Sequence, residues 1–572
     1  MNKSIAQTPI TTDNLYRYLQ NHGNQSGMWS YQDPRDGKWY QLLMVYGADK
    51  RAKLLRREYP HCAFDKLVDV HDELGGDELE PDSHNWPAVA VSRDGYIHIT
   101  SNHHVDPFNF AISDQPWDCS SFTNESPVVS SSDENRVTYP AFVQVPGGDL
   151  LMFFREQEVS PSRFRYLVYA WNETTQQWEK RGQDLNTGTE LRLYISTVSV
   201  DPSTGRIHLF AMWRDDAGPG TGAGNSEDYW HMYSDDQGQT WRQLESPGST
   251  VSLPLNIGTV PNLIRNTQPH PNDLNLVNLF SSAVDANGDP HGLVPHAQSA
   301  GGGSRQWHHY WWNGSGWSSR VISSFSYDGN GVHLVRGQGL EMWAVYLDSS
   351  GDNSCVRAVN LTPTSPQYDD EEIELTCQLS HNSSSPILDF SAFNRGEDIL
   401  SLFTVRATAS PPRQADEDDR PLWRQDGQVI TYEGMNSIRQ YGAPYQLQEI
   451  SRANNLSGSG PWSVSLPSLG DQSCPVSYYA KMTARGSGGS VWLDIGNGDR
   501  IGEVEMGGVA TKTTPIMPLL GFSGGSLSVN ATNGFNAQDV DVIFYRLNGC
   551  QAVERQFKED ADGVSCLQSN WT

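Results

Sequence analysis

Ser234-Asp235-Asp236-Gln237-Gly238-Gln239-Thr240-Trp241 is the stretch that decides the fold of this chain. It is a complete Asp-box, in which an aspartate side chain caps a tight turn between two outer strands of a sheet. The tryptophan at the end of the motif packs beneath that turn. The motif marks a repeated sheet module and carries no catalytic group of its own, so it predicts architecture and says little about chemistry.

Short strands joined by tight turns recur on both sides of the Asp-box. Val89–Val91 leads through the turn Arg93–Gly95 into a second strand, Tyr96–Ile99. The same strand–turn–strand unit returns at residues 143–154, 197–213 and 281–293. Long helical periodicity is nearly absent, and the turns are rich in Gly, Asn, Asp and Pro. These patterns are typical of an all-β protein.

Tryptophan residues follow several of these strand pairs, at Trp39, Trp178, Trp241 and Trp317. The intervals between the last three are 63 and 76 residues. A repeat of this length with four strands per unit is typical of a β-propeller blade with long loops. Seven such blades fit into about residues 25–440.

From about Leu456 onward the sequence no longer follows the blade repeat. Strands are predicted at Val491–Ile495, Ser526–Val529 and 540–545. We therefore predict an all-β chain with a seven-bladed β-propeller in residues 1–440 and a β-rich region in residues 441–572. The latter is expected to form a small β-sheet or β-sandwich appendage, which serves either as a sugar-binding module or as a packing element.

The charge balance excludes some classes of partner. The formal net charge is −28, with 40 basic and 68 acidic residues, and a nucleic-acid surface would need a basic patch instead. No apolar run approaches the roughly 20 residues that a membrane helix needs. We expect a monomer without nucleic-acid or membrane partners.

Cysteines and glycosylation motifs point to export. Cys355 with Cys377, and Cys550 with Cys566, are close enough in sequence to form disulfides, and the odd count of 7 leaves at least one thiol over. None forms a CxxC pair or a Cys/His cluster with zinc spacing. Six N-x-S/T motifs begin at Asn172, Asn313, Asn360, Asn382, Asn455 and Asn530. We predict a secreted, extracellular protein, although residues 1–16 lack the apolar stretch of a signal peptide.

Four clusters of polar and aromatic residues fall at similar places in successive blades. They are His84–Pro87, Ser101–His104, Thr138–Pro140 with Phe153–Arg155, and Arg192–Tyr194 with Met212–Arg214. Each cluster alone is explained by packing. Because the innermost strands of a propeller converge on a central channel, residues from different blades can meet there, and we predict that these form one site.

The run His84–His104, HNWPAVAVSRDGYIHITSNHH, resembles the BNR-type propeller polysaccharide lyases, which include the ulvan lyases and the L-rhamnose-α-1,4-D-glucuronate lyases. Their pattern has His-Asn, a hydrophobic strand, an acidic residue with Gly-Tyr-Ile-His, and Gly-Asn-x-His. The Tyr-Pro pair followed by Tyr/Phe-Arg also matches at Tyr139 and Arg155, and Tyr194 fits a further active-site tyrosine. The resemblance covers about residues 80–350, with weaker support to 430.

This resemblance implies eliminative cleavage beside a glucuronate. A base removes the C5 proton and the group on C4 leaves, which requires that the neighbouring carboxylate be neutralised. A guanidinium suits that role because it is always charged and binds carboxylates in a bidentate way, and Arg155 and Arg214 are the candidates. A His/Tyr pair suits the proton transfers, with Tyr139 and His104 foremost and the acid and base roles open.

The predicted site therefore contains two groups of residues, catalytic and substrate-binding. The resemblance places His84, His104, Tyr139, Arg155 and Tyr194 in the catalytic centre. It places Asn85, His103, Arg214 and His309 among the residues that bind substrate. No metal ligand is predicted and no cofactor is required, although a structural calcium ion is compatible with this prediction.

The sequence also departs from the family pattern. Asn-His-Asp of many relatives reads Ser226-Glu227-Asp228, Gly-Asn-Met-His reads Ser101–His104, and no cysteine near the Asp-box blade could hold the structural zinc of some ulvan lyases. We expect an enzyme that releases rhamnose from arabinogalactan-like glycans such as gum arabic. The alternatives are an endo-acting ulvan lyase, a sialidase-like hydrolase and a non-catalytic sugar-binding propeller.

Overall fold

Alternating strands and tight turns form nearly all the regular structure of the computed structural model. The helix α1 (Phe390–Asn394) is the one helix among the residues that the structure describes. The chain divides into two units, residues 6–442 and residues 443–572 with residues 1–5. No helix in the described part of the chain is long and apolar enough to cross a membrane.

The structure describes most of the first unit and the strand backbones of the second. The described residues are 5–10, 26–46, 51–59, 64–76, 85–125, 128–129, 132–159, 162–186, 191–215, 226–246, 249–256, 262–264, 276, 280–298, 304–325, 331–337, 339–348, 354–379, 386–397, 399–407, 425–433 and the strands between 447 and 547.

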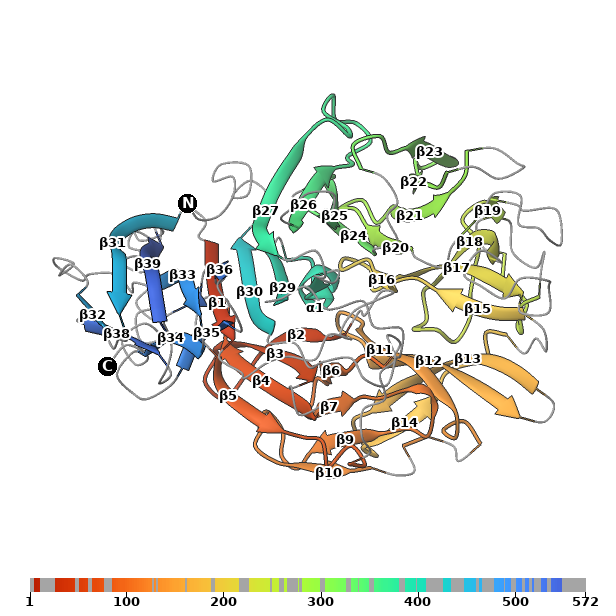
Figure 1. Ribbon diagram of the computed structural model, residues 1–572. Coiled ribbons are helices and arrows are strands. Elements are labelled where there is room, and N and C mark those ends of the chain that lie inside the picture. Colours follow the sequence, from red (N-terminus) through yellow and green to blue (C-terminus); the bar gives the residue numbers. More distant parts are fainter. Residues whose placement is uncertain are drawn as a thin grey trace. The chain divides into compact units, whose positions relative to one another are not determined.

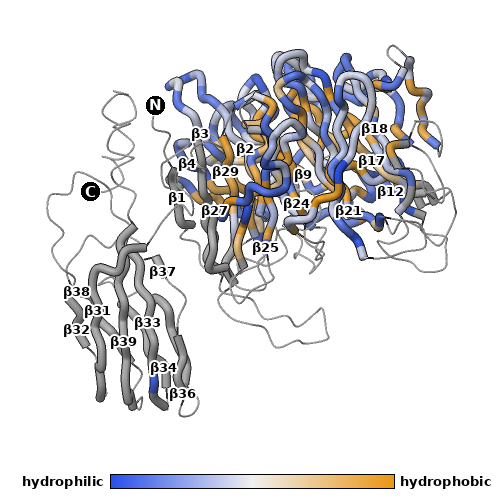
Figure 2. The backbone as a smooth tube through the Cα atoms, turned by 90° about the horizontal axis from the view of Figure 1, so that it is seen from above, coloured by the Kyte–Doolittle hydropathy of each residue, from blue (hydrophilic) through white to orange (hydrophobic). Residues whose placement is uncertain are grey.

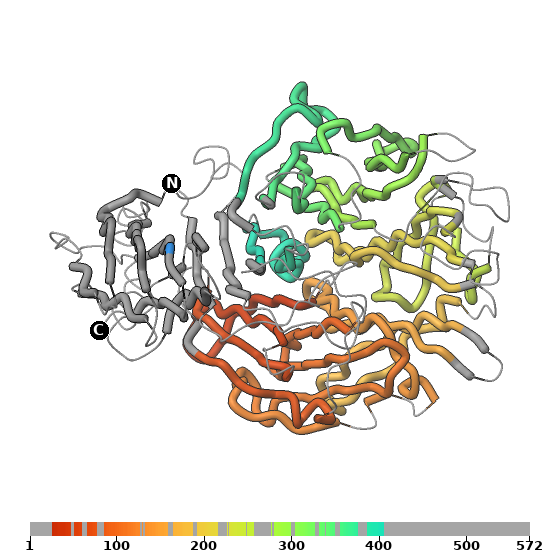
Figure 3. The backbone as a smooth tube through the Cα atoms, in the orientation of Figure 1, coloured from red at the N-terminus to blue at the C-terminus, as the bar shows by residue number. Residues whose placement is uncertain are grey.

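Six sheets of the first unit are blades built from strands that lie close together in the sequence, and they follow one another around a ring (Figures 1 and 3). Blade 1 contains β2 (Met28–Gln32), β3 (Trp39–Tyr46), β4 (Ala52–Glu58) and β5 (Phe64–Asp69). Blade 2 contains β6 (Ala88–Val91), β7 (Ile97–Thr100), β9 (Phe110–Ser113) and β10 (Phe122–Asn124). Blade 3 contains β8 (His104–Asp106), β11 (Val137–Gln144), β12 (Leu150–Val159), β13 (Ser162–Asn172) and β14 (Gln177–Lys180).

The other three blades follow the same antiparallel plan. Blade 4 contains β15 (Leu191–Ile195), β16 (Ser199–Val200), β17 (Ile207–Asp215), β18 (Ser226–Ser234) and β19 (Asn262–Ile264). Blade 5 contains β20 (Ser281–Val284), β21 (Pro290–His296), β22 (Gln306–Trp312) and β23 (Trp317–Val321). Blade 6 contains β24 (Val332–Arg336), β25 (Met342–Asp348), β26 (Ser354–Asn360) and β27 (Glu372–Leu379).

The remaining sheet of this unit has a different origin, and we call it the closing sheet. Its strand order is β1-β30-β29-β28, formed by β1 (Ile5–Ile10), β28 (Ile387–Leu388), β29 (Ile399–Ala407) and β30 (Gln425–Glu433). The all-β propeller class predicted from the sequence is thus confirmed, with six blades of this local kind rather than seven. The difference arises because the last sheet takes its outer strand from the start of the chain.

The predicted strand–turn–strand units are present at the expected places. In blade 2, Val89 pairs with Ile99 across the turn, and in blade 5 Ala283 pairs with His291. The Asp-box turn also forms as predicted: Asp236 accepts hydrogen bonds from the Thr240 backbone N–H (2.8 Å) and hydroxyl (2.6 Å), and Trp241 is fully buried.

One tryptophan has a different place from the one predicted. Trp178 and Trp317 follow the third strand of their blades, as expected for closing turns. Trp39 instead begins the second strand of blade 1, after the turn from β2. An Asp-Gly turn followed by Trp suits either hairpin, so the local sequence could not separate the two positions.

The hydrophobic core lies between neighbouring blades. One cluster of buried side chains joins blades 1, 2 and 3, and a second joins blades 3 and 4. Hydrophobic segments follow the strands of the sheets, while many connections are hydrophilic (Figure 2). Each blade thus buries both faces and leaves strand ends and loops for function.

The second unit contains two antiparallel sheets. The first is made of β31 (Leu447–Gly458), β33 (Tyr478–Ser487), β36 (Ala510–Thr513), β37 (Met517–Pro518) and β39 (Asn536–Leu547). The second is made of β32 (Trp462–Ser465), β34 (Gly489–Asp494), β35 (Arg500–Met506) and β38 (Ser526–Ala531). The three strands predicted in this region are among them.

The described cysteines are of two kinds. Cys355 on β26 is disulfide-bonded, and β26 pairs with β27, which carries Cys377. Cys119 is buried and forms no disulfide. The predicted pair Cys550 and Cys566 lies outside the described residues.

Candidate active site

Four of the eight described non-glycine residues with left-handed backbone angles lie in or next to the strands that carry the predicted site residues. They are Asn102 (φ 61°), Val105 (φ 73°), Tyr139 (φ 59°) and Asp228 (φ 53°). Val105 stands out because a β-branched residue rarely adopts a positive φ. Such residues cost about 1–3 kcal/mol each and persist where the surrounding structure holds them, typically at functional sites.

A cross-strand row in blade 3 brings residues from four strands together. Thr138 on β11 pairs with His104 on β8 and with Arg155 on β12, and Arg155 pairs with Tyr166 on β13. Residues directly opposite one another in a sheet share a face. A bulge between Thr138 and Ala141 interrupts the β11–β12 register and accompanies the positive φ of Tyr139.

Arg155 lies at the centre of the site and is only 2% exposed. Its guanidinium carbon lies 4.8 Å from the ring centre of Tyr139, 5.1 Å from that of Tyr194 and 5.9 Å from that of Phe164. Burial lowers the pKa of Arg155, but its interactions with the phenol groups of Tyr194 and Tyr139 raise it above its usual value. The Nη1 atom is buried and has no hydrogen-bond partner.

A neighbouring arginine in the same blade has carboxylate partners and serves as a comparison. Arg165 on β13 is also buried, and its Nη2 lies 3.0 Å from a Glu156 oxygen and 2.9 Å from an Asp133 oxygen. The groups with the largest effect on the pKa of Arg155, apart from burial, are tyrosine phenols rather than carboxylates. Because a buried cation needs a counter-charge, the free edge of Arg155 is suited to an anionic ligand.

Tyr194 is a phenol held among arginines. It is 7% exposed, and its oxygen accepts a hydrogen bond from Arg214 Nη1 at 3.2 Å. Burial raises the pKa of Tyr194, but the charges of Arg155, Arg214 and Arg192, with a hydrogen bond from Arg155, make the net shift downward. A lowered pKa stabilises the phenolate and makes Tyr194 the strongest described candidate for a general base.

Tyr139 and the loop before β6 form one wall of the site. The Tyr139 ring stacks on Trp86 at 5.0 Å and lies 6.1 Å from the Tyr194 ring. Asn85, predicted to bind substrate, is buried next to Trp86. His84, a predicted catalytic residue, lies outside the described residues.

The two histidines of the Ser101–His104 cluster differ in their surroundings. His104 is half-buried and lies beside Thr138 in the row that contains Arg155. His103 is buried: its Nε2 accepts a hydrogen bond from the Asn109 N–H (2.8 Å), and its Nδ1 faces the Thr100 hydroxyl at 3.4 Å. Burial lowers the pKa of His103 to about 3, and both ring nitrogens are engaged within the chain.

The structure does not bring His309 to this group. His309 is fully buried on β22, where its Nε2 lies 2.9 Å from His291 Nδ1 and its Nδ1 lies 3.1 Å from the Tyr368 hydroxyl. No described contact joins it to Arg155, Tyr139 or Tyr194. Its place is in a packed network between strands of blades 5 and 6.

Several residues at the site were not singled out from the sequence. Arg192 lies opposite Arg214 in the β15–β17 pairing and places its guanidinium 4.1 Å from the ring centre of Phe164. Trp86 and Tyr166 also line the group around Arg155. Arg192 directly precedes the Leu193-Tyr194 pair, so a search for basic residues beside the predicted phenol would have found it.

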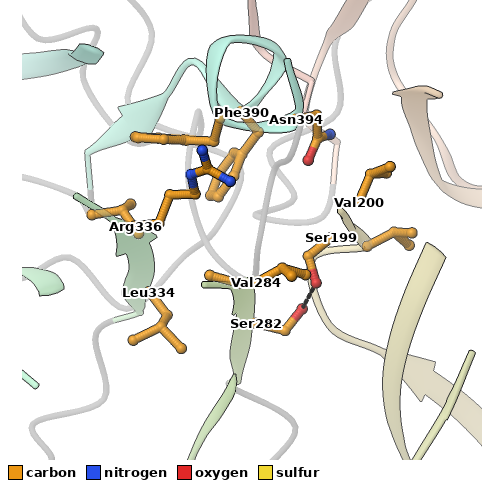
Figure 4. A pocket seen from close by; sticks show the side chains of 12 residues that line it. Ser199, Val200, Ser282, Val284, Leu334, Arg336, Phe390 and Asn394 are labelled. Atoms are coloured by element: carbon orange, nitrogen blue, oxygen red, sulfur yellow. Dashed lines mark hydrogen bonds between the residues drawn. The ribbon is translucent and has the colours of Figure 1, made fainter. Parts of the chain in front are cut away.

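A separate pocket lies among the inner strands of the propeller (Figure 4). It is lined by residues of β16, β20, β24 and α1. Ser199 and Ser282 are hydrogen-bonded in its wall at 3.3 Å. Among the described residues that line it, Arg336 is the one charged residue and no His, Tyr or carboxylate is present, so they provide no acid–base pair. Among the described residues, the Arg155–Tyr194 group is therefore the better candidate, because it combines a cation with phenols.

Within the described ranges, no group of three or more His, Cys, Asp or Glu side chains comes together as a ligand set.

Comparisons with known proteins agree with this architecture. A model of the BNR repeat-containing family matches residues 39–325, just over half of the chain. No curated protein matches the sequence. Among solved structures, the fold is similar to the crystal structure of polysaccharide lyase Uly1, with a TM-score of 0.53 and 14% identity over 75% of this chain and 99% of that chain.

A second similar structure is a PL25 ulvan lyase bound to -[GlcA(1-4)Rha3S]-. It has a TM-score of 0.51 and 14% identity over 70% of this chain and 92% of that chain. At this level of identity the likeness shows a shared β-propeller fold. The family match confirms the BNR-type resemblance read from the sequence.

Proposed function

Because this chain belongs to the BNR repeat-containing family, we propose that its first unit is a polysaccharide lyase acting on a uronic-acid glycan. The observation that carries the proposal is the buried guanidinium of Arg155, with its unpartnered Nη1 beside a phenol of lowered pKa. That pairing supplies a carboxylate-binding cation and a base within one site. The similarity to two lyase structures adds support at the level of the fold.

The proposed reaction is β-elimination at a glucuronate. Arg155 binds the C6 carboxylate, which makes the C5 proton more acidic and holds the charge that builds in the transition state. The Tyr194 phenolate takes the C5 proton, the C4–O4 bond breaks, and the electron pair forms the C4=C5 double bond. A proton from Tyr139 or His104 goes to the leaving O4, giving an unsaturated uronate and a new free hydroxyl.

The proposed bond is the rhamnose-α-1,4-glucuronate linkage. The favoured substrate is an arabinogalactan-like glycan such as gum arabic, from whose ends rhamnose would be released. The second candidate substrate is ulvan, because one similar structure holds a glucuronate–rhamnose ligand.

One assay tests both candidates. The purified protein is incubated with gum arabic and with ulvan, and the ultraviolet absorbance of an unsaturated uronate is followed. We expect the signal with gum arabic together with free rhamnose. Sugar release without this absorbance would indicate a hydrolase, and no product from any uronate glycan would overturn the lyase proposal.

We also propose that the closing sheet serves as a seventh blade. Ser30 and Gln41 of blade 1 are hydrogen-bonded to Ser391 and Asp389 beside β28, and β27 of blade 6 contacts β29. Pairing of the first strand with the last sheet would remove a free sheet edge. Deleting residues 1–10 should lower the melting temperature, and an unchanged value would contradict this proposal.

Secretion follows as a further proposal. The disulfide at Cys355 supports it, because disulfides persist mainly in oxidising compartments. Mass spectrometry of the native protein should find glycans on the predicted sequons, and unmodified asparagines throughout would count against export by a glycosylating route.

A further inference from the structure

The boundary between blades 3 and 4 runs through the candidate active site. β13 of blade 3 contacts β15 of blade 4, and the two strands lie next to each other in Figure 1. Arg155 belongs to blade 3, whereas Tyr194 belongs to blade 4. The distance between the proposed carboxylate-binding cation and the proposed base is therefore set by contacts between two separate sheets.

Two contacts between a cation and a ring cross this boundary in opposite directions. The ring centre of Tyr194, from blade 4, lies 5.1 Å from the guanidinium carbon of Arg155 in blade 3. The ring centre of Phe164, from blade 3, lies 4.1 Å from the guanidinium carbon of Arg192 in blade 4. Each blade thus supplies one ring and one cation to the other, and we call these four residues the cross-blade lock.

Phe164 connects the two contacts of the lock. It is 5% exposed, and its ring centre also lies 5.9 Å from the guanidinium carbon of Arg155. Phe164 precedes Tyr166 by two residues on β13, and Tyr166 pairs with Arg155, so all three side chains share one face of the sheet. One ring therefore lies within cation–π range of two arginines from different blades.

Arg192 lies close to another positive charge, so its position needs an anchor. It is directly opposite Arg214 in the β15–β17 pair, and like charges in such a pair repel. Tyr194 follows it by two residues on the same face of β15. An aromatic ring attracts a cation without bringing a negative charge. Phe164 thus holds Arg192 beside Tyr194 and leaves its charge effective, whereas carboxylates like those beside Arg165 would offset it.

We propose that Phe164 is a positioning residue of the candidate active site, whose ring fixes Arg192 and Arg155 at the distances from Tyr194 that the reaction needs. This inference rests on the proposed lyase function. Phe164 acts through the two arginines and makes no contact with substrate. Loss of the ring should therefore let both guanidinium groups move, which weakens uronate binding and changes the ionisation of Tyr194.

The ionisation of Tyr194 reports on the lock because several charges act on this phenol. Burial raises its pKa, but Arg155, Arg214 and Arg192 lower it and make the net shift downward. If the arginines move away, the pKa of Tyr194 rises. The other described titratable side chains that interact with Tyr194 or share its buried cluster are the phenols of Tyr139, Tyr166, Tyr229 and Tyr310.

The test compares Phe164→Leu, which removes the ring and keeps an apolar side chain, with Phe164→Tyr, which keeps the ring. The matched control is Tyr233→Leu, because Tyr233 is also buried and Arg206 lies 4.3 Å from its ring centre. Tyr233 pairs with His208 near the start of β17, whereas Arg214 lies near the end of that strand. The control therefore removes a similar cation–ring contact from blade 4 away from the site.

We expect Phe164→Leu to raise KM for gum arabic about threefold to tenfold and to move the acidic limb of the kcat/KM profile by about half a pH unit or more to higher pH. Phe164→Tyr should keep both near their wild-type values. Tyr233→Leu should lower the melting temperature without moving the limb. A limb that stays at the wild-type pH in Phe164→Leu would overturn the proposal, and so would an equal shift in Phe164→Tyr or Tyr233→Leu.

Two further measurements cover the cases in which this comparison fails. If Phe164→Leu does not fold, as judged by its melting temperature, Phe164→Met, which also lacks a ring, takes its place with the same expected shift. If the wild type forms no unsaturated product from any uronate glycan, the lyase proposal fails. The lock is then judged by ultraviolet titration of the Tyr194 phenol, taken as the difference between each protein and its Tyr194→Phe variant. A higher titration pH in Phe164→Leu than in the wild type supports the lock, and an equal value rejects it.

Discussion

Arg155 and Arg165 are two buried arginines on neighbouring strands, and their partners separate function from stability. Arg165 is neutralised by Glu156 and Asp133, whereas Arg155 faces phenol rings and has an unpartnered nitrogen. A buried charge without a counter-charge contributes little to folding and is retained for what it binds.

Substitution by alanine should therefore lower activity at Arg155 and stability at Arg165. Arg155→Ala should lower kcat/KM about 10²-fold to 10³-fold with little change in unfolding free energy. Arg165→Ala should cost about 3–5 kcal/mol of stability because it strands two buried carboxylates. Urea unfolding and initial rates measure the two quantities. A large stability loss in Arg155→Ala would contradict the ligand-binding role.

Arg214 should control the ionisation of Tyr194. Its charge and its hydrogen bond to the phenol lower the pKa of Tyr194. A base must be deprotonated to act, so activity appears as the pH rises through its pKa. Arg214→Ala raises that pKa, and the acidic limb of the kcat/KM profile should move to higher pH. Tyr194→Phe should remove most of the activity and with it the acidic limb of the kcat/KM profile. If the acidic limb stays at the same pH in Arg214→Ala, Tyr194 is not the base.

At the scale of elements, turns and bulges carry the information that places the site. The Asp-box turn could be predicted from its eight residues because the hydrogen bonds that close it, from Thr240 to Asp236, are local. The bulge at Tyr139 has no comparable local signal. It depends on how β11 pairs with β8 and β12, so only the assembled sheet shows that Tyr139 turns back over Arg155.

The Asp-box offers a matched pair of substitutions on adjacent residues. Asp236→Ala removes two hydrogen bonds to Thr240 and should lower the unfolding free energy by about 1 kcal/mol. Asp235→Ala removes only an exposed ion pair with Arg206 and should change stability by less than about 0.5 kcal/mol. Denaturant midpoints compare the two, and equal losses would show that the turn hydrogen bonds add nothing beyond surface charge.

For the whole molecule, buried histidines link stability to pH. Burial lowers the pKa of His98, His103 and His208 from 6.5 to about 3 in the folded chain. An unfolded histidine titrates near 6.5, so between these values the unfolded state binds more protons. Stability is therefore greatest above about pH 6.5 and decreases as the pH falls towards 3.

Calorimetry at successive pH values checks this expectation. The melting temperature should fall steadily from pH 7 to pH 4.5, and His98→Asn, which cannot take up a proton, should show a shallower fall relative to its own value at pH 7. A melting temperature that does not change over this range would contradict the neutral state of the buried histidines.

The sequence by itself determined the repeated strands, the Asp-box, the all-β propeller class and the residue types around the site. These follow from short-range patterns, in which turn residues and alternation act within about ten positions. Only the tertiary structure decided that, among the described residues, phenols surround Arg155 while carboxylates pair with Arg165, that His309 belongs to a packed network, and that the last sheet closes with the first strand. Burial, counter-charges and pKa shifts depend on side chains from different blades, and no pattern along one strand records which of them will meet.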